Sequence, residues 1–347
     1  MKQAPETFSR RLIEWQKRHG RHDLPWQRTR DPYRIWLSEI MLQQTQVATV
    51  IPYYQRFLER FPDVAALAAA PLAAVIEAWA GLGYYARARN LHRCAQRVME
   101  DHGGRFPATP EELAGLPGIG PSTAAAIAAF AWGRRAAILD GNVKRVFCRH
   151  FGIEGVPGTA AADRALWALA DSLLPEDDME AYTQGLMDLG ATVCTRPRPA
   201  CGLCPLQATC VAYRQGRQAE LPARRPRPAL PERETTLVLI SDGQHILFER
   251  RPPAGIWGGL LVPPEGEPAA VLARLGLHAE DCLELPPLLH VFTHFRLHIR
   301  PVLCRVAPDC HTAAERNLEW LAIGLAPAAG VPTPVKKLVR LVASAGD

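Results

Sequence analysis

The sequence lacks any segment that would anchor the protein in a membrane or direct it to secretion. No run of about 20 apolar residues is free of charge and proline, and a helix needs about that length to span a bilayer. Residues 1–20 contain Arg, Lys and Glu throughout and no apolar stretch typical of a secretory signal. We therefore expect a protein without membrane contact, in a reducing, cytoplasmic compartment.

Neither sign of charge is in large excess, and the composition argues against a disordered chain. The 347 residues include 40 Lys and Arg against 35 Asp and Glu, a net charge of +5, with 48% hydrophobic and 22% charged residues. Such values are ordinary for a globular protein, and this length should hold two or three domains. A mildly basic chain permits an anionic partner without requiring one, so the motifs have to identify it.

Cysteine is scarce, with nine in the chain, yet four lie within one 17-residue segment in the pattern Cys-x6-Cys-x2-Cys-x5-Cys: Cys194, Cys201, Cys204 and Cys210. Four thiolates this close indicate a metal or a metal cluster. Structural zinc sites usually present two close pairs of ligands, and only Cys201 and Cys204 form such a pair. The spacing therefore favours an iron–sulfur cluster. Zinc is the alternative, and the simplest explanation without a metal is that the four are incidental buried thiols. No role is assigned to the other five cysteines, which are expected to be simple thiols: Cys94, Cys148, Cys282, Cys304 and Cys310.

A proline- and arginine-rich stretch divides the chain into two regions of different character. Residues 214–234 contain six Arg, three Glu and four Pro and follow neither a helical nor a strand period, which is typical of an extended linker. Before it, apolar residues recur at helical spacing, as in residues 36–41 and 64–79. After it, β-branched and alternating stretches such as residues 235–240 and 290–302 are separated by Gly and Pro. We predict a helical N-terminal region and a smaller mixed α/β C-terminal domain.

Residues 116–124, Leu-Pro-Gly-Ile-Gly-Pro-Ser-Thr-Ala, predict a helix-hairpin-helix. One helix should end near Leu113 and an alanine-rich helix should begin at Ser122, with a tight turn through Gly118 and Gly120 between them. The glycines leave the backbone N–H groups bare, and these groups together with the positive end of the second helix can hold a phosphate. An ordinary tight turn with a capping serine is the alternative.

Two carboxylates stand where an active site could form. Glu39 lies inside an otherwise apolar helix start, where desolvation would raise its pKa and keep a proton available near neutral pH; the alternative is an exposed helix glutamate. Asp140 follows a short apolar stretch and precedes a helix, so it could cap that helix or face a positive charge that develops on a sugar. The polar run of residues 43–46 is unusual for a core helix and favours the wall of a cleft.

Five motifs resemble those of MutY-type adenine DNA glycosylases: the hairpin, the cysteine loop, and residues 37–47, 81–90 and 139–143. The resemblance covers nearly the whole chain. It implies a multidomain fold, with an all-α N-terminal region, in which a six-helix barrel carrying the helix-hairpin-helix adjoins a [4Fe-4S] cluster module, followed by an α/β Nudix-like domain. The implied boundaries are 1–225 for the catalytic region (barrel about 28–134, cluster module about 1–27 plus 135–225), 226–234 for the linker and 235–347 for the Nudix-like 8-oxoguanine recognition domain.

The resemblance also implies a reaction: a monomer excises adenine mispaired with 8-oxoguanine or G in duplex DNA, after the adenine is flipped out of the helix. Glu39 would protonate N7 of adenine and handle the proton of the attacking water, while ionised Asp140 stabilises the sugar cation. Asn142 would help to order this site. Ser122 occupies the position of the Schiff-base lysine of endonuclease III-type glycosylase/lyases, and an alcohol cannot form an imine. We therefore expect a glycosylase without lyase activity.

Further residues match DNA-binding positions of the family. Gln44 and Tyr84 correspond to residues that wedge into the base stack beside 8-oxoguanine, with an exposed polar residue and a core tyrosine as the plain alternatives. Lys144 is expected to contact a phosphate of the DNA rather than to form an imine.

The C-terminal domain lacks the feature that would make it a Nudix hydrolase. Residues 268–279 contain no Asp or Glu, so the magnesium-binding helix of those enzymes cannot form. Recognition is the role left: residues 290–295 resemble the loop of the family that contacts 8-oxoguanine, with Phe292, Thr293 and His294 at the matching positions. Many relatives carry Ser where this chain has Thr293, which keeps the hydroxyl and adds a methyl group. A plain β-hairpin turn is the alternative.

Two other classes of function stay open at this point. A non-catalytic DNA-binding protein would keep the hairpin and the cluster, and only Glu39 together with Asp140 argues against it. A bifunctional lyase or a zinc-stabilised nuclease would differ from a simple glycosylase in borohydride trapping and in metal content.

Overall fold

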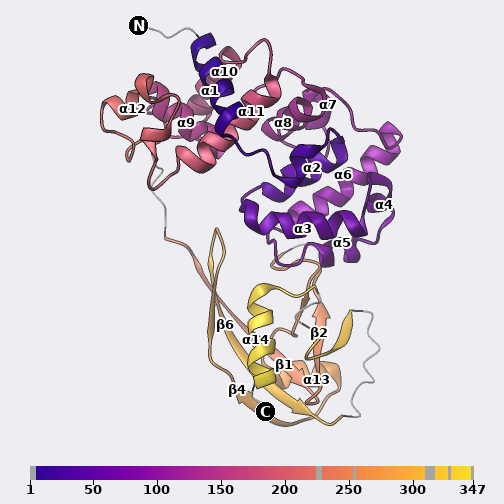
Figure 1. Cartoon of the computed structure of the whole chain (residues 1–347). Coiled ribbons are helices and arrows are strands. Elements are labelled where there is room, and N and C mark those ends of the chain that lie inside the picture. Colours follow the sequence, from indigo (N-terminus) through magenta and orange to yellow (C-terminus); the bar gives the residue numbers. More distant parts are fainter. Residues whose placement is uncertain (1–4, 224–228, 253–254, 309–316, 327–329, 345–347) are drawn as a thin grey trace. The chain divides into compact units, whose positions relative to one another are not determined.

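The computed structural model describes residues 5–223, 229–252, 255–308, 317–326 and 330–344. Contacts between Cα atoms divide the chain into two compact units, Met1–Ala69 with Asn90–Arg227 and Ala70–Arg89 with Pro228–Asp347. The first unit is helical and the second contains a sheet (Figure 1), which confirms the predicted fold class. Within the described ranges, no helix combines the length and the apolar character needed to cross a bilayer.

The ends of the helices in the first unit follow from local chemistry. The Asp31 side chain accepts a hydrogen bond from the backbone of Tyr33, and a proline follows it, so α2 begins there. Thr109 caps α7 in the same way. α8 ends at Gly133, whose φ of 65° lies in the left-handed region. The helices are α1 (Pro5–His19), α2 (Pro32–Leu42), α3 (Val47–Arg60), α4 (Val64–Ala69), α6 (Ala86–His102, which begins in the second unit), α7 (Pro110–Ala114), α8 (Pro121–Trp132), α9 (Gly141–Phe151), α10 (Ala160–Ser172), α11 (Met179–Asp188) and α12 (Val211–Arg214), with single turns at Pro25–Arg28, Leu189–Val193, Cys201–Leu203 and Gln207–Thr209.

α8 is the central helix of this unit. Alanine fills half of its positions, and its side chains are buried all round the helix, which is the pattern of a helix enclosed by others. It packs against α2, α7 and α11. Small side chains allow these helices to approach closely, and the contact with α2 brings the helix of Glu39 next to the hairpin.

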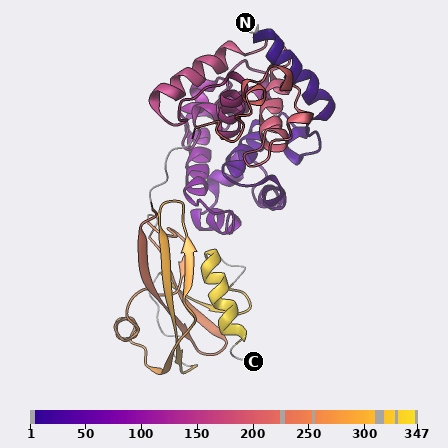
Figure 2. The same ribbon diagram turned by 90° about the vertical axis from the view of Figure 1, so that its left-hand side faces the viewer.

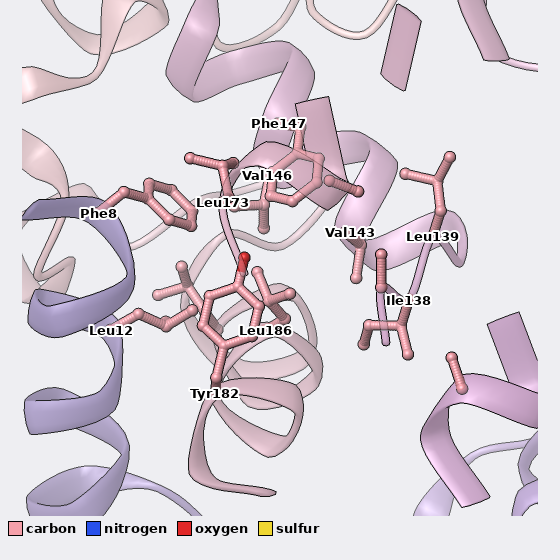
Figure 3. Close-up of a cluster of buried hydrophobic side chains, with 14 of the residues drawn as sticks. Phe8, Leu12, Ile138, Leu139, Val143, Val146, Phe147, Leu173, Tyr182 and Leu186 are labelled. Atoms are coloured by element: carbon pink, nitrogen blue, oxygen red, sulfur yellow. The ribbon is translucent and has the colours of Figure 1, made fainter. Parts of the chain in front are cut away.

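A hydrophobic core forms where α1, α9 and α11 meet (Figure 3). Phe8 and Leu12 of α1 are clustered with Phe147 of α9 and Leu186 of α11, all of them buried. The Phe8 and Phe147 rings meet edge to face with their centroids 5.9 Å apart. Asp140 is the N-cap of α9, so this core fixes the position of one candidate catalytic residue.

Tyr182 carries a buried hydroxyl that has no hydrogen-bond partner among the described residues. Its ring and oxygen point into the core of Figure 3, and 1% of the residue is exposed. An unpaired buried polar group costs about 1–3 kcal/mol. We therefore expect Tyr182→Phe to raise the free energy of unfolding by about 1 kcal/mol, measured by urea unfolding followed by circular dichroism.

Tyr33→Phe is the matched control for this prediction. Tyr33 is also buried, but its hydroxyl donates to the Phe61 carbonyl at 2.6 Å. Removing the Tyr33 hydroxyl should therefore lower the free energy of unfolding by about 1 kcal/mol or more. If Tyr182→Phe lowered stability as Tyr33→Phe does, the Tyr182 hydroxyl would have a partner after all.

A seven-stranded sheet forms the centre of the second unit, in the order β3-β2-β1-β6-β4, with β5 also pairing with β6 and β7 with β2. β1 and β6 run parallel, and the other pairs are antiparallel. The elements are β1 (Glu232–Ser241), β2 (His245–Arg250), β3 (Leu261–Val262), β4 (Ala279–Glu284), β5 (Leu288–Val291), β6 (Arg296–Val306), β7 (Leu318–Ala322), α5 (Leu72–Ala78), α13 (Pro268–Leu275) and α14 (Thr333–Ser344). β1 begins inside the expected linker 226–234, because residues 232–234 pair in register with residues 296–298 of β6. The domain boundaries as a whole stay predictions.

Helices cover both faces of this sheet. Val238 and Ile240 of β1 share a buried cluster with Val271 of α13. Leu237 and Leu239 alternate with them along the strand, so they point to the opposite face, and they too are fully buried. Figure 2 shows α14 (yellow) along one side of the sheet. The buried residues of α14 form one stripe: Pro334, Val335, Leu338, Val339 and Val342.

Cys282 and Cys304 correct the expectation that the cysteines outside the cysteine loop are all simple thiols. The two residues lie directly opposite each other on antiparallel strands β4 and β6 and form a disulfide. Opposed positions on neighbouring strands bring the Cβ atoms within disulfide reach, and this pairing depends on strand register across 22 residues of sequence. Cys94 and Cys148 are buried free thiols, as expected, and Cys310 lies outside the described residues.

Candidate active site

Glu39 lies on α2 and lines a cavity of about 530 Å³ inside the first unit. Burial and, less strongly, the negative charge of Asp140 raise the pKa of Glu39 to about 8. A carboxyl group with this pKa is mostly protonated at neutral pH and can donate a proton to a leaving group. The plain alternative, an exposed helix glutamate, does not describe this residue.

The cavity has the size and lining of a pocket for a small aromatic molecule. Trp26, Leu42 and Met187 contribute apolar surface, and Gln27 and Gln184 contribute polar groups. Small-molecule sites typically combine an apolar wall with a few polar groups that fix orientation. Glu39 therefore faces a space in which a nucleobase could be held.

The polar end of this pocket is oriented by a buried carboxylate. Asp188 is fully buried and accepts hydrogen bonds from the Arg21 backbone N–H at 2.9 Å and from Arg21 Nε at 2.7 Å. It also accepts from Gln184 Nε2 at 2.8 Å. Because a carboxylate only accepts, the amide nitrogen of Gln184 must face Asp188. The carbonyl oxygen of Gln184 is the end left for a ligand.

Asp140 occupies the N-cap of α9 and keeps one carboxylate oxygen unused. Its Oδ1 accepts from the backbone N–H groups of Asn142 at 2.9 Å and Val143 at 2.8 Å. Its Oδ2 makes no hydrogen bond to any residue in the described part of the chain. Oδ1 thus accepts both hydrogen bonds at the N-terminal end of α9. Asp140 can therefore cap the helix through Oδ1 and present Oδ2 to a cation.

Ser122 and Asn142 support Asp140 from two sides without facing the pocket. The Ser122 Oγ accepts from the Leu139 backbone N–H at 3.0 Å, which fixes the backbone immediately before Asp140. The Asn142 Oδ1 accepts from Arg145 Nη2 at 2.8 Å, and neither Ser122 nor Asn142 lines the 530 Å³ cavity. Ser122 therefore contacts the backbone before Asp140, and Asn142 lies at the start of α9.

Two buried arginines that the sequence analysis did not single out join α9 to the cysteine loop. Arg145 donates to the Cys194 carbonyl at 2.7 Å. Arg149 donates to Cys194 Sγ at 3.4 Å and to the Thr195 carbonyl at 2.7 Å. The two arginines are four residues apart and therefore lie on the same face of α9. The sequence shows this spacing, but it predicts a basic face toward solvent as readily as a buried contact with the cysteine loop.

The four cysteines of the loop gather around one small cavity. Cys194, Cys201, Cys204 and Cys210 line a space of about 30 Å³ and are all free of disulfides. Burial, and more weakly the charges of the other three sulfurs, raise the pKa of Cys204 to about 12, so a metal would have to displace the proton. In the described ranges no three His, Cys, Asp or Glu side chains converge on a point that one ion could occupy. Four thiols around a shared cavity are a donor set for a metal or a metal cluster.

The helix-hairpin-helix is present, formed by α7 and α8, which pack against each other. Gly118 has a φ of 81°, and a Cβ at this position would lie 2.8 Å from the Cβ of Asn90, so only glycine fits. Gly120 is the N-cap of α8, and a Cβ there would meet nothing within 4 Å. α8 starts at Pro121, one position before the predicted Ser122. The backbone at Gly120 is thus open to an approaching phosphate.

Lys144 already has an anionic partner in the structure. Its ammonium group lies 2.9 Å from both carboxylate oxygens of Asp163, and this contact holds the pKa of Asp163 below its usual value. A phosphate contact from Lys144 would require this ion pair to open or to be shared. This pair could not be predicted from the sequence, because Asp163 lies 19 residues away on another helix.

Gln44 and Tyr84, the two expected wedge residues, share an unusual backbone conformation. Their φ angles are +57° and +49°, and in the described ranges only Asp178 and Trp257 join them among residues other than glycine. A left-handed conformation costs a residue with a side chain about 1–2 kcal/mol, and such strain gathers at functional sites. Gln44 is exposed and Tyr84 is 44% exposed, so Tyr84 is not a core tyrosine.

Residues 292–294 form the turn between β5 and β6, closed by a hydrogen bond from the Phe292 N–H to the Phe295 carbonyl at 2.9 Å. The Phe292 and Phe295 rings are stacked with their centroids 4.5 Å apart. The Thr293 hydroxyl is exposed and lies 3.4 Å from His294 Nδ1. Within the second unit, this turn and Tyr84 line one cavity of about 650 Å³ that no Asp or Glu of the described chain lines. The segment is therefore a hairpin turn, and it also forms the wall of a pocket.

Comparisons with known proteins agree with this architecture. Residues 37–171 match the family described as HhH-GPD superfamily base excision DNA repair protein. Residues 235–341 match the NUDIX domain family. A solved structure described as a thermostable thymine-DNA glycosylase is 30% identical, with a TM-score of 0.55 over 61% of this chain and 97% of that one.

Curated relatives match the chain over almost its whole length. The adenine DNA glycosylase of Buchnera aphidicola subsp. Acyrthosiphon pisum is 34% identical over 338 residues, which are 96% of this chain and 97% of that protein. The adenine DNA glycosylase of Homo sapiens is 33% identical and is aligned over 96% of this chain and 74% of that protein. Both units of this chain are thus present in each relative. The chain belongs to the MutY family of adenine DNA glycosylases.

Proposed function

We propose that this protein hydrolyses the N-glycosidic bond of adenine mispaired with 8-oxoguanine or G in duplex DNA, as a glycosylase without lyase activity. The observation that carries the proposal is Glu39, whose pKa is raised to about 8 on the wall of a base-sized cavity. Asp140 lies close enough for its charge to act on Glu39. A protonated acid beside a carboxylate is the pair that glycoside hydrolysis requires.

The adenine must leave the base stack before it can react. The bond to its sugar is out of reach inside a duplex, so the nucleotide has to rotate into the cavity that Glu39 lines. Glu39 then donates its proton to N7 of the adenine, which becomes a neutral leaving group as the C1′–N9 bond breaks. The ionised Glu39 can next accept a proton from the water that attacks C1′.

Asp140 faces the charge that appears on the sugar. Breaking the C1′–N9 bond leaves an oxocarbenium-like cation, and a fixed carboxylate nearby lowers the energy of that state. Asp140 is held by two backbone N–H groups through Oδ1, so Oδ2 is free to act without reorganisation. The Ser122 contact to Leu139 and the cap of α9 keep this geometry in place.

Gln184 supports the choice of adenine. Asp188 orients its amide so that the carbonyl oxygen remains for a ligand. That oxygen can accept a hydrogen bond from the exocyclic amine of adenine, whereas guanine and hypoxanthine would oppose it with a carbonyl oxygen. A polar group left unpaired in the pocket costs about 1–3 kcal/mol, which favours adenine.

The same chain offers groups for the opposite strand. The hairpin at Gly118 and Gly120 would hold a DNA phosphate, and Gln44 and Tyr84 would enter the stack beside 8-oxoguanine. The turn at residues 292–294 would contact the lesion in the cavity that it lines with Tyr84. Lys144 would reach a phosphate only by sharing its bond with Asp163.

The four loop cysteines would hold a [4Fe-4S] cluster, whose iron–thiolate bonds tie the loop to the fold. Purified protein should be yellow-brown and contain about four irons per chain. Cys201→Ser should lose iron, with a lower unfolding temperature and weaker DNA binding, since Arg145 and Arg149 connect the loop to α9. Cys94→Ser, at a buried thiol outside the loop, is the control and should keep its iron. Colourless, folded protein with stoichiometric zinc would contradict this assignment.

The Thr293 hydroxyl should contribute to lesion preference. Thr293→Val removes the hydroxyl and keeps the shape, so the ratio of excision rates for 8-oxoguanine:A over G:A should fall, by about 5- to 10-fold for one lost hydrogen bond. Thr293→Ser, which keeps the hydroxyl, is the matched control and should preserve the ratio. Changing His294 to Ala as well should lower it further. An unchanged ratio in Thr293→Val would remove this hydroxyl from lesion recognition.

A direct test of the reaction follows the released base. Protein and duplex carrying adenine opposite 8-oxoguanine are incubated, and chromatography should detect free adenine while the strand stays intact until alkali is added. Borohydride should trap little covalent complex, because Ser122 cannot form an imine. Strand cleavage without alkali and efficient trapping would support a lyase instead.

A further inference from the structure

Tyr84 is held on a strained loop between α5 and α6. Gly81, Gly83 and Tyr84 have φ angles of +107°, +73° and +49°, so three of four successive residues are left-handed. Glycine adopts such angles freely, but a tyrosine does not. The Tyr84 ring is 44% exposed, so packing of the ring in a core cannot hold this conformation. Another group must stabilise the loop.

Arg87, at the first turn of α6, contacts both ends and the middle of this loop. Its guanidinium lies 5.4 Å from the centroid of the Tyr84 ring and 5.3 Å from that of the Trp79 ring. Its Nη2 donates to the carbonyls of Leu82 and Gly83, each at 3.3 Å. The Trp79 indole N–H donates to the Gly83 carbonyl as well, at 3.2 Å. One cation thus meets the exposed ring, a buried ring and the backbone between them.

Only arginine can make this set of contacts. Its planar guanidinium can meet aromatic rings and donate in its plane at the same time, which the compact ammonium of lysine cannot do. The residue is 9% exposed, and burial lowers the pKa of Arg87 to about 10, so it remains charged at neutral pH. Burying this charge costs free energy, and the contacts of Arg87 with the loop explain why the charge is kept there.

We propose that Arg87 is a positioning residue that fixes the Tyr84 ring in its projecting orientation before DNA binds, so that insertion beside the lesion needs no ordering of the loop. The inference rests on the wedge role given to Tyr84 in the proposed function. A side chain that is already ordered loses less entropy on binding, and accurate placement strongly affects the rate of a positioned reaction. Arg87 therefore acts on excision through Tyr84.

A double-mutant cycle in the full-length protein tests this dependence. Adenine excision opposite 8-oxoguanine is measured under single-turnover conditions for wild type, Arg87→Lys, Tyr84→Ala and the double variant. We expect Arg87→Lys to slow excision about tenfold in the wild-type background. It should change the rate less than about twofold once Tyr84 is Ala, because the group through which it acts is gone.

Two further measurements separate positioning from other roles. Arg87→Lys should bind undamaged duplex within about twofold of wild type, since it contacts no phosphate in this account. Amide hydrogen exchange of the free protein should be faster at residues 82–85 and unchanged elsewhere. Arg97→Lys, on the same helix and exposed in an ion pair with Asp101, is the matched control and should match wild type in each assay.

The outcomes distinguish this inference from the proposed function. If Arg87→Lys slowed excision equally in the wild-type and Tyr84→Ala backgrounds, or slowed it in neither, Arg87 would not act through Tyr84. The proposed function would be unaffected, because it rests on adenine excision by the wild type. If Tyr84→Ala excised at the wild-type rate, the wedge role would fall and the inference with it. If Arg87→Lys did not fold, Arg87→Gln, which keeps an amide donor, would replace it in the cycle. Failure of both to fold would assign Arg87 to folding and reject the proposal.

Discussion

Glu39→Gln is expected to bind DNA carrying 8-oxoguanine:A and to excise adenine about 10²–10⁴-fold more slowly than wild type, the range typical for loss of a general acid–base group. The amide has nearly the shape of the protonated carboxyl group but cannot give up a proton. Single-turnover assays measure the rate, and gel-shift titration measures the binding. A rate near that of wild type would remove Glu39 from the mechanism.

The pH dependence of excision and of stability tests the role of Glu39 independently. Burial raises the pKa of Glu39 from 4.5 to about 8, so the proton donor is lost as the pH rises through about 8 and wild-type excision should fall there. The folded state holds this proton more tightly than the unfolded chain does. Its contribution to stability is therefore full below pH 4.5 and is lost as the pH rises through about 8. At pH 9 Glu39→Gln should unfold at a higher temperature than wild type.

Asp140→Asn is expected to fold normally and to lose about 10²–10³-fold in excision rate, as when one electrostatic contact to a transition state is removed. Asparagine is as good an N-cap as aspartate, so Oδ1 can keep its bonds to Asn142 and Val143 while the negative charge opposite the sugar is lost. Asp140→Ala separates the role of the charge from the role of the cap. It should lose the charge and the cap, and therefore about 1 kcal/mol of stability as well. Rapid excision by Asp140→Asn would leave Asp140 with the capping role alone.

Local sequence patterns predicted the parts of the molecule that local chemistry determines. The hairpin follows from Gly118, whose backbone angle and close approach to Asn90 exclude other residues. The raised pKa of Glu39 follows from its place among apolar residues of α2. The cysteines of the loop lie within 17 residues of one another, so their gathering around one cavity needed no knowledge of the tertiary fold.

Contacts between distant segments could not be predicted in this way. The Cys282–Cys304 disulfide depends on the register of β4 against β6, and the start of β1 at Glu232 depends on its pairing with β6. Two side-chain contacts of α9 depend on which face of this helix meets its neighbours. They are the hydrogen bond from Arg145 to Asn142 and the ion pair of Lys144 with Asp163. Each side chain has several plausible partners in the sequence, and only packing selects one.

The most direct test of the proposed function compares three duplexes that differ in one base. Adenine is placed opposite 8-oxoguanine, G or T, and abasic sites are cleaved with alkali after single-turnover incubation. We predict fast excision opposite 8-oxoguanine, slower excision opposite G and none opposite T, with the rates opposite 8-oxoguanine and G both reduced to near background by Glu39→Gln. Equal rates on the three duplexes, or no alkali-labile site opposite 8-oxoguanine, would contradict it.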